Sequence, residues 1–279
     1  MIRKIHRLNR GLLEAYLREN EVSLLPLAGN YWAEGLRRSP GRMRAGRYVL
    51  ALREGRPVGV AAEFNDGNCM VFTREEEAAR ELAEYAERWY FHSVWCFGMT
   101  EKAAACFPVY AGDRQMVCLP HEMWVRREIP AWQPPEGLVF SDARELTRDG
   151  KAVAFMQNIL WECFEQRVSP DMIISRLKQR EADEPHLLCM AGRRYVSQCH
   201  IQAWGKTAAH IGGVATLASA RHRGYGRAVL EEICRYIAGK GRLPTLTVRR
   251  DNDEAMKMYE NAGFRRLEPV WVWEVRFGD

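Results

Sequence analysis

Three strand-like segments separated by two short turns are the strongest constraint on how the carboxyl-terminal half can fold. The segments are residues 187–191, 195–204 and 208–217, and the turns are 192–194 (GRR) and 205–206 (GK). Strands joined by such short, glycine-containing turns pair with their neighbours in antiparallel fashion. The sequence therefore predicts an antiparallel meander over residues 187–217.

Helical segments flank this meander on both sides. Residues 149–164 have helical periodicity, and Ser169 and Pro170 have the cap and first-position chemistry that opens a second helix over 170–180. After the meander the sequence predicts, in order, a glycine-rich turn, a helix at 227–238, a strand at 245–249, a helix at 253–262 ended by Gly263, and a strand at 271–276. This order of elements predicts an α+β domain.

A proline-rich segment near the middle of the chain is the clearest candidate for a domain boundary. Residues 129–137 hold three prolines and a glycine, which stop a helix or a central strand from continuing. The chain has 279 residues, and about 100–200 residues per domain suggests two domains. We therefore predict one domain at 1–130, a linker at 131–137 and a second domain at 138–279.

The amino-terminal half repeats part of the same order. Strand-like segments at 48–52, 58–63 and 69–72 are followed by a helix at about 74–90, a strand at 93–98 and a short helix from Glu101. A repeated order of this kind indicates two divergent copies of one supersecondary plan. The predicted fold class of the whole chain is α+β, with two tandem domains that are each a mixed, mostly antiparallel sheet flanked by helices.

Composition and charge argue against several other classes of protein. Hydrophobic residues make up 47% and aromatic residues 10% of the chain, whereas disordered chains combine low hydrophobicity with high net charge. The net charge of +5 is spread evenly, with 19 basic against 17 acidic residues in 1–135 and 22 against 19 in 136–279, which disfavours nucleic acid as a partner. No apolar run approaches the ~20 residues of a membrane helix, and the amino terminus lacks the apolar core of a signal peptide. We therefore expect no membrane association and a cytoplasmic location.

The eight cysteines have no pattern of a metal site. They lie at least ten residues apart, without a CxxC pair and without a histidine pair at ligand spacing nearby. Most have apolar neighbours in the sequence, and free cysteine behaves as a small buried hydrophobe. We predict reduced structural thiols and no metal.

The turn before the predicted helix at 227–238 has the chemistry of an anion site. It has the pattern Arg-x-x-Gly-x-Gly from Arg221 to Gly226. The first turn of a helix presents unpaired N–H groups and a partial positive charge, and glycine lets the backbone approach a phosphate. A dinucleotide fold or a P-loop fits less well, because the third glycine of GxGxxG and the Gly-Lys-Ser/Thr sequence are absent.

Two motifs in this half resemble those of the GCN5-related N-acetyltransferases. That family binds acetyl-CoA through an Arg/Gln-x-x-Gly-x-Gly/Ala turn after its fourth strand. The segment from Asn252 to Phe264 (NDEAMKMYENAGF), about 25 residues downstream, is similar to the family's Asn-x-x-Ala-x-x-x-Tyr-x-x-x-Gly-Phe helix. The two motifs occur in the right order, which is far more specific than either alone, and the resemblance covers residues 138–279.

The resemblance implies acetyl-CoA as co-substrate. The backbone of Val214, Ala215 and Thr216 would pair with the pantetheine arm as though the arm were another strand, and Asn252 would help to hold it. The pyrophosphate would lie against a turn whose implied binding residues are Arg221, His222, Arg223, Gly224, Tyr225, Gly226 and Arg227. The alternatives from local structure alone are an ordinary central strand at 214–216 and a helix cap at Asn252.

The resemblance also implies a proton donor for the departing sulfur. Tyr259 occupies the position of the family's tyrosine that protonates or stabilises the leaving thiolate. A phenol with a pKa near ~10 suits that role. The alternative is a packed aromatic on the inner face of its helix.

The sequence leaves three candidates for the general base. His210 lies eleven residues before Arg221, at the position of a base on the family's fourth strand, and strand alternation would place it on one face with Gly212 and Val214. The alternative for His210 is a packed or surface histidine. Glu162 and Glu165 are rivals on the helix at 149–164, where the family often builds its acceptor pocket, and their alternative is a solvated helical face.

The amino-terminal half resembles the family only in the order of its elements. Where the glycine turn would be, residues 72–77 read FTREEE, and Glu75, Glu76 and Glu77 would repel a pyrophosphate. We expect a degenerate copy that does not bind coenzyme A in this manner. We also expect it to pack against the other domain and to form one wall of the acceptor cleft.

The sequence therefore predicts an N-acetyltransferase. It would transfer an acetyl group from acetyl-CoA to the primary amine of a small molecule or peptide by direct attack in a ternary complex. Two alternatives are a non-catalytic acyl-CoA-binding regulatory module and an aminoacyl-tRNA-dependent transferase. The intact turn and Tyr259 favour catalysis, and the even charge disfavours tRNA.

Overall fold

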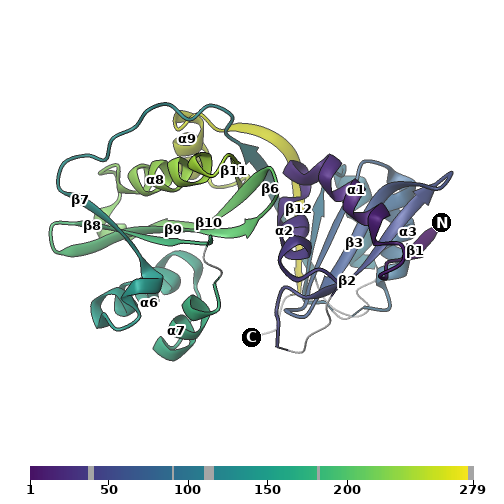
Figure 1. Cartoon of the computed structure of the whole chain (residues 1–279), viewed down its shortest axis with the longest axis horizontal. Coiled ribbons are helices and arrows are strands. Elements are labelled where there is room, and N and C mark those ends of the chain that lie inside the picture. Colours follow the sequence, from purple (N-terminus) through teal and green to yellow (C-terminus); the bar gives the residue numbers. More distant parts are fainter. Residues whose placement is uncertain (37–40, 90, 110–115, 181–182, 276–279) are drawn as a thin grey trace.

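The two halves of the chain share one continuous sheet (Figure 1). The computed structural model describes residues 1–36, 41–89, 91–109, 116–180 and 183–275. Within them the sheet has twelve strands in the order β1-β2-β3-β4-β5-β12-β6-β11-β10-β9-β8-β7. The strands are β1 (Ile2–Lys4), β2 (Gly46–Arg53), β3 (Arg56–Phe64), β4 (Asn68–Thr73), β5 (Ser93–Phe97), β6 (Met116–Val125), β7 (Leu138–Asp142), β8 (His186–Ala191), β9 (Arg194–Trp204), β10 (Ala208–Thr216), β11 (Leu243–Arg249) and β12 (Arg265–Val275).

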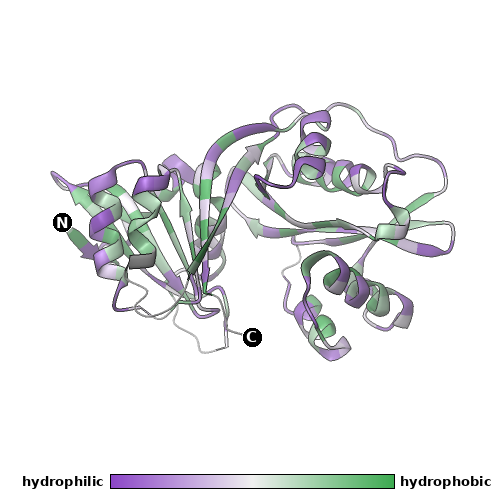
Figure 2. Ribbon diagram, turned by 180° about the vertical axis from the view of Figure 1, so that it is seen from behind, coloured by the Kyte–Doolittle hydropathy of each residue, from purple (hydrophilic) through white to green (hydrophobic). Residues whose placement is uncertain are grey.

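Helices cover both faces of this sheet in each half (Figures 1 and 2). They are α1 (Arg10–Asn20), α2 (Leu25–Glu34), α3 (Glu76–Ala86), α4 (Glu101–Ala104), α5 (Cys106–Val109), α6 (Gly150–Phe164), α7 (Pro170–Lys178), α8 (Tyr225–Gly239) and α9 (Asp253–Asn261). Strand alternation explains the two layers: Tyr48 and Leu50 of β2 pack with α1 and α2, whereas Val49 and Ala51 pack with α3. Figure 2 shows hydrophobic residues along the strands and hydrophilic ones on the outer sides of the helices.

Both halves follow the plan predicted from the sequence. In the carboxyl-terminal half β7, β8, β9 and β10 form the antiparallel meander, and α8 connects β10 to β11, its parallel neighbour. In the amino-terminal half β2, β3 and β4 form a meander, and α3 connects β4 to β5, again its parallel neighbour. The predicted fold class is thereby confirmed.

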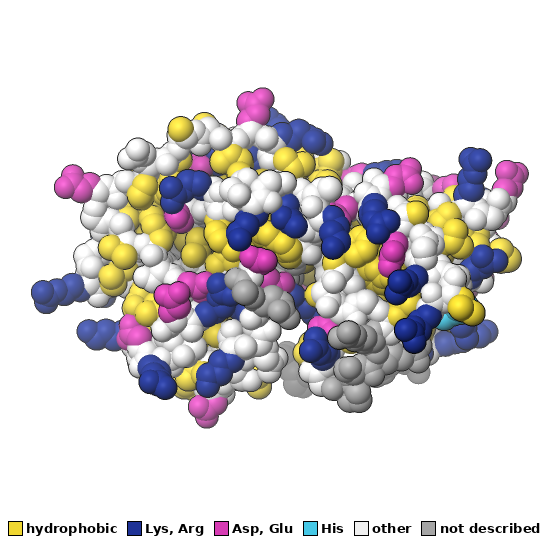
Figure 3. Space-filling model, viewed as in Figure 1, with side chains coloured by type: hydrophobic (Ala, Val, Ile, Leu, Met, Phe, Trp, Pro, Cys, Tyr) yellow, Lys and Arg dark blue, Asp and Glu magenta, His cyan; other side chains and the backbone are white. Residues whose placement is uncertain are grey.

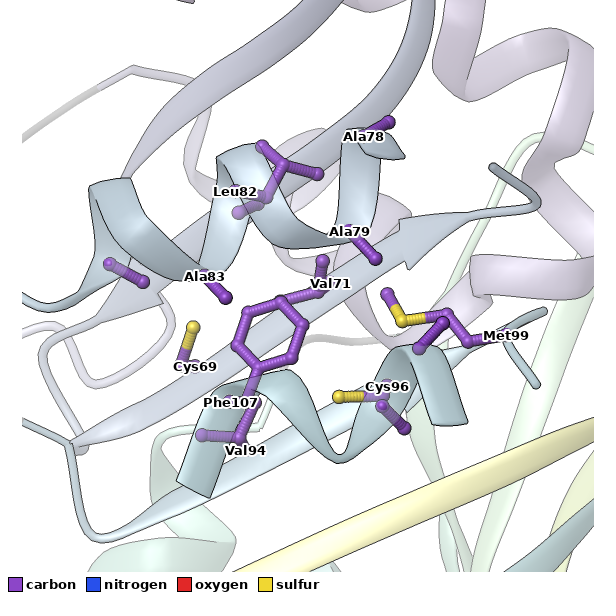
Figure 4. Close-up of a cluster of buried hydrophobic side chains, with 14 of the residues drawn as sticks. Cys69, Val71, Ala78, Ala79, Leu82, Ala83, Val94, Cys96, Met99 and Phe107 are labelled. Carbon is purple, nitrogen blue, oxygen red and sulfur yellow. The ribbon is translucent and has the colours of Figure 1, made fainter. Parts of the chain in front are cut away.

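A hydrophobic core lies under α3 in the amino-terminal half. The helix α3 presents Ala79, Leu82 and Ala83 to the sheet, and these are fully buried. Figure 4 shows the ring of Phe107 from α5 lying beneath this helix and next to the strand residue Val71. The small alanines allow the helix to approach the sheet closely, which leaves space for the large ring.

The halves exchange strands at the centre of the sheet. β6 precedes the proline-rich segment in the sequence, yet it lies between β11 and β12 and pairs with both in antiparallel fashion. β12 in turn pairs with β5 of the amino-terminal half. The domain limits at 1–130 and 138–279 stay a prediction, but neither sequence segment contains all the strands that its part of the sheet uses.

Side-chain contacts reinforce this junction. Glu21, which is buried, accepts hydrogen bonds from the backbone N–H of Thr207 at 2.6 Å and from Trp32 Nε1 at 2.8 Å. Arg44 makes a two-pronged ion pair with Glu184 at 2.6 and 2.9 Å, and Glu184 is also buried. Buried charges that are paired in this way resist separation of the halves, because pulling them apart would leave a charge without its partner. The expectation that the two halves pack against each other agrees with these contacts.

Candidate active site

The sheet opens between β10 and β11. The two strands pair only over Ala208 to Ile211, opposite residues 243–246, and diverge beyond that point. A bulge follows in β10, where the pairing with β9 shifts between Gly212 and Ala215 and Gly213 takes a φ of 60°. A bulge bends its strand and increases the local twist, so the backbone after Ile211 turns away from β11.

A cavity of about 1300 Å³ lies at this opening. The backbone of Gly212, Gly213 and Val214 lines one side of it, and Thr247 and Val248 line the other. Because successive strand residues point to opposite faces, the presence of both Thr247 and Val248 means that the cavity reaches both faces of the sheet. Side chains from α6, α7, α9 and the amino-terminal half complete its wall.

The glycine-rich turn begins α8 in the geometry that the sequence predicts. Gly224 is the residue before the helix and has a φ of 79°, a region that glycine occupies without steric cost. A side chain at Gly226 would place its Cβ 2.9 Å from Thr216 Oγ1 and 3.5 Å from Met258 Sδ, so the helix start lies close to β10 and α9. The unpaired N–H groups of this first helical turn are therefore available to an anion.

The polar side chains of the turn are exposed and bonded only to neighbouring elements. Arg221 donates from Nε to the carbonyl of Thr216 at 3.3 Å and lies 3.7 Å from Cys163 Sγ. His222, with a φ of 59°, has its Nδ1 3.7 Å from the Glu254 carboxylate, and Arg227 lies 3.7 Å from Glu231. Arg223 and Tyr225 complete the turn, Arg223 fully at the surface and Tyr225 partly covered. The turn thus brings three arginines to one helix N-terminus.

Tyr259 from α9 reaches the cavity from the α8 side of the sheet. Its side chain is buried in the core under α8 and packs edge-on against Phe264, with ring centroids 6.0 Å apart. Burial raises the pKa of its hydroxyl well above the usual value, because the phenolate is poorly solvated there. Among the described residues its hydroxyl has no hydrogen-bond partner. The phenol is therefore protonated at neutral pH and free to donate a hydrogen bond. Its ring is also packed in the core, as in the alternative interpretation of Tyr259 as a packed aromatic.

Asn252 combines the two roles considered for it. Its side-chain oxygen accepts from the Ala255 N–H at 3.1 Å, which caps α9, and the residue also lines the cavity. Val214, Ala215 and Thr216 lie at the end of β10, where Val214 faces the cavity and Ala215 is buried. The hydroxyl of Thr216 lies 3.0 Å from Ser197 Oγ, so this part of β10 remains tied to β9 while its other edge is open.

His210 occupies a packed position. It is buried, and its Nδ1 and Nε2 lie 3.0 and 3.1 Å from the hydroxyls of Thr245 and Thr247. Burial lowers its pKa to about 3, so the imidazole is neutral at physiological pH. It is not part of the cavity wall, whereas Ile211 to Val214 are consecutive members of it. The register of β10 against β9 already shifts between His210 and Ile211 and shifts again after Gly212, which breaks the strand alternation used for the prediction. These contacts favour the packed interpretation of His210.

The two glutamates of α6 differ in position. The Glu162 carboxylate accepts a hydrogen bond from the Ala218 N–H and so holds the segment after β10. Glu165 directly follows the last residue of the helix as its C-cap, with a φ of 55°, and its exposed side chain lines the cavity. Of the two, only Glu165 is placed to meet an acceptor.

Sequence reasoning missed several titratable residues of the cavity, including His186, His200 and, on the side of the amino-terminal half, His121. His121 belongs to β6 and lines the cavity together with Leu119 from the same strand and Trp95 from β5. Neither family motif includes it, and β6 itself was not predicted. The signal that could have found it is the alternation of Leu119, His121 and Met123 on one face of a strand.

Comparison with known proteins agrees with this geometry. Residues 153–264 match the family model described as the acetyltransferase (GNAT) family. This part of the chain is a GNAT domain. The match ends at Phe264, so it includes the open strand β10, the turn before α8 and the helix α9. The family and the fold support acyl transfer as the general activity. No curated protein matches the chain.

Several solved structures resemble the whole chain in fold, and two of the following three are named as GNAT proteins. A Drosophila protein has a TM-score of 0.68 at 12% identity, with 98% of each chain covered. A GCN5-related N-acetyltransferase from Sphaerobacter thermophilus has a TM-score of 0.61 at 15% identity and covers 100% of this chain and 96% of its own. A tandem GNAT protein from the clavulanic acid biosynthesis pathway has a TM-score of 0.53 at 14% identity, with 100% and 99% covered. The likeness shows that the tandem GNAT fold extends over both halves.

Proposed function

We propose that the protein is an N-acetyltransferase that uses acetyl-CoA and acts on a primary amine. One observation carries the proposal: the edge of β10 that lines the cavity, at Gly212 to Val214, is not paired with β11, and the same strand leads directly into the glycine turn that begins α8. The amide groups of an extended pantetheine arm can form hydrogen bonds with the main chain of such an edge. A pyrophosphate is satisfied by the N–H groups of such a turn.

The surface charge agrees with a diffusing small-molecule substrate. Figure 3 shows Lys and Arg side chains intermingled with Asp and Glu over the face that it presents. The arginines of the turn, Arg221, Arg223 and Arg227, then act locally on the phosphates. None of the helices in the described residues is long and apolar enough to cross a membrane. A cytoplasmic location stays a prediction.

The proposed reaction needs no covalent intermediate on the protein. The amine nitrogen attacks the thioester carbonyl carbon, a C–N bond forms, and the C–S bond breaks in the collapse of the tetrahedral intermediate. Two protons must move: one leaves the attacking nitrogen, and one reaches the departing sulfur. Holding both substrates in the right orientation in one cavity lowers the activation free energy, and positioned acid and base groups lower it further by transferring the two protons.

Tyr259 is the proposed donor to the sulfur. We expect Tyr259→Phe to lower kcat about 10²–10⁴-fold while the dissociation constant of acetyl-CoA stays within a few-fold, because the ring remains and only the proton donor is lost. Thiol release measures the first quantity and titration calorimetry the second. Tyr236→Phe is the matched control, since Tyr236 lies on α8 and packs beside Trp204 and Lys240 outside the cavity wall. Unchanged turnover in Tyr259→Phe would reduce Tyr259 to a packing residue.

Release of free thiol from acetyl-CoA tests the proposed function as a whole. The full-length protein is mixed with acetyl-CoA and, in separate reactions, tyramine, spermidine and glycylglycine, which present three kinds of primary amine. Thiol release that depends on the amine supports the proposal. Binding of acetyl-CoA without release for any amine would favour the regulatory module. Transfer only from a charged tRNA would favour the aminoacyl-tRNA-dependent alternative.

A further inference from the structure

His121 lies where the amino-terminal half reaches the centre of the cavity. On one side of it in the sheet is Arg249 of β11, and on the other is Val270 of β12. Trp95 and Leu119 stand beside it in the cavity wall. All three of these wall residues precede the proline-rich segment, so this part of the wall comes from the copy that lacks a glycine turn.

The imidazole of His121 is held in one orientation. Its Nδ1 lies 2.7 Å from the carbonyl oxygen of Leu119, and its ring lies against that of Trp95, with centroids 5.7 Å apart. A carbonyl can only accept, so Nδ1 carries the hydrogen and Nε2 is left with a lone pair. No described residue bonds Nε2, and the side chain is half-buried at the cavity. The free nitrogen is thus a proton acceptor with a fixed direction.

The surroundings keep this ring neutral at physiological pH. Burial lowers the pKa of His121, and the nearby Arg249 and Arg250 lower it further, while the bond to Leu119 and the carboxylate of Asp251 act in the opposite direction. Arg249 is paired with Asp251, and Arg250 with Glu122 at 2.8 Å. The other charged groups of the cavity wall are Glu274 on β12, Glu165 and Arg176 on the α6 and α7 side, Arg180 beyond α7, and Asp253 and Glu254 on α9. Its remaining titratable groups are Cys163 on α6, His186 on β8 and His200 on β9, and burial lowers the pKa of both histidines.

We propose that His121 is the general base of the reaction. The inference rests on the proposed N-acetyltransferase function. As the nitrogen of the amine attacks the thioester carbon, His121 Nε2 accepts the proton that the nitrogen gives up. Tyr259 supplies a proton to the departing sulfur. The imidazolium then returns its proton through water to the tyrosine, so the charges balance at the end of the turnover.

The other candidates are less well placed for this step. The nitrogens of His210 face two threonine hydroxyls, and Glu162 already accepts from the backbone of Ala218. Glu165 lines the cavity, but its side chain is exposed at the end of α6 and has no partner in the described residues that fixes its direction. A base is most effective when its pKa lies near the operating pH, which favours an imidazole over an exposed carboxylate. Glu165 is the rival that the experiment must separate from His121.

His121→Asn is the sharpest variant, because the asparagine amide can still donate to the Leu119 carbonyl while nothing replaces Nε2. We expect kcat at pH 7 with saturating acetyl-CoA and the best of the three amines to fall about 100-fold or more. The wild type should lose activity as the pH falls through the pKa of His121, which lies below the ordinary value near 6.5, and that limb should vanish in the variant. Added imidazole should restore part of the turnover of His121→Gly.

His92→Asn is the matched control. Its Nδ1 also lies 2.7 Å from a backbone carbonyl, that of Gly67, but His92 is remote from the cavity wall. We expect its turnover to stay within about twofold of wild type. Titration calorimetry with acetyl-CoA checks that each variant retains the coenzyme site.

Three results would overturn the proposal. One is a His121→Asn variant with wild-type turnover. Another is lost turnover with the acidic limb unchanged and no rescue of His121→Gly by imidazole, which is the behaviour of a structural residue. The third is that Glu165→Gln abolishes the acidic limb while His121→Asn keeps it. Absence of thiol release from wild type with every amine would instead overturn the proposed function, and the role of His121 with it.

Discussion

Replacing Gly226 by tryptophan is expected to abolish the binding of acetyl-CoA. A Cβ at this position would lie 2.9 Å from Thr216 Oγ1, and that hydroxyl cannot retreat because it lies 3.0 Å from Ser197 Oγ on β9. The larger side chain must therefore push the start of α8 away from β10, across the place where the backbone has to meet the phosphates. We expect the dissociation constant to rise at least about 100-fold, equivalent to about 2.7 kcal/mol.

Gly224 is needed for its backbone conformation and not because a side chain would lack space there. Its Cβ would meet no atom within 4 Å, but its φ of 79° is unfavourable for any other residue. A non-glycine residue in such a backbone region costs of order 1–3 kcal/mol, so Gly224→Trp distorts the turn or destabilises it. The double variant at Gly224 and Gly226 should bind no measurable acetyl-CoA.

Gly239→Trp is the control for these variants. Gly239 ends the same helix, has open space at its Cβ and lies far along α8 from the turn. Titration calorimetry should find wild-type affinity in this variant. If the Gly224 and Gly226 double variant also bound acetyl-CoA as tightly as wild type, with a cooperative thermal transition, the turn would not be the phosphate site.

The sequence predicted the elements around the turn well because their signals are local. Ser169 and Asn252 both cap their helices through the side chain, as their residue types suggest. Glu75, Glu76 and Glu77 stand where α3 begins, which is the counterpart of the glycine turn in the other half. Caps, turns and period-2 alternation depend on neighbours a few residues away, and a single sequence contains them.

The strand β6 was missed because its sequence contradicts a central strand. Pro120 cannot donate a ladder hydrogen bond, and proline inside a run normally indicates an edge or no strand. In the structure the pairing of β6 with β11 ends at His121, and Pro120 only accepts, from the Arg250 N–H at 2.9 Å. The missing N–H therefore falls where the pairing with β11 ends, which no local pattern could have revealed.

The acceptor side of the cavity could not be predicted from local sequence patterns either. His121 and Tyr259 are 138 positions apart and come together only because β6 inserts between strands of the other half. His210 was placed by counting along a strand, and the bulge after Gly212 changed which residues face the opening. Long-range strand exchange and local bulges depend on tertiary structure, so motif spacing does not predict them.

The fragment 136–279 is expected not to fold, although it contains the whole GNAT domain and both family motifs. Among the residues that the structure describes, β12 pairs only with β5 and β6, and β11 pairs with β6 along most of its length. The fragment removes both partners of β12. It also removes Met123, Trp124 and Val125, which are almost completely buried.

The free energy lost with these three buried side chains is comparable to the net stability of a whole domain. Burying a large apolar side chain contributes about 1.5–3 kcal/mol, so the three residues together contribute about 5–9 kcal/mol. Whole domains have a net stability of only about 5–15 kcal/mol. In the fragment β12 has neither of its partners and β11 keeps only β10, so both strands also present exposed edges, which promote aggregation.

The fragment 116–279 is the matched comparison, because it adds back only β6 and the segment 126–135 that follows it, in which the buried Arg126 pairs with Glu231. It restores the neighbour of β11 and one neighbour of β12, while the contacts of α2 and β5 are missing from both fragments. We expect 136–279 to be insoluble or to lack a cooperative thermal transition by circular dichroism, and 116–279 to recover solubility at least in part. If 136–279 were soluble and fully active toward the same amine as the full chain, the strand β6 would be dispensable and the amino-terminal half would form no part of the acceptor site.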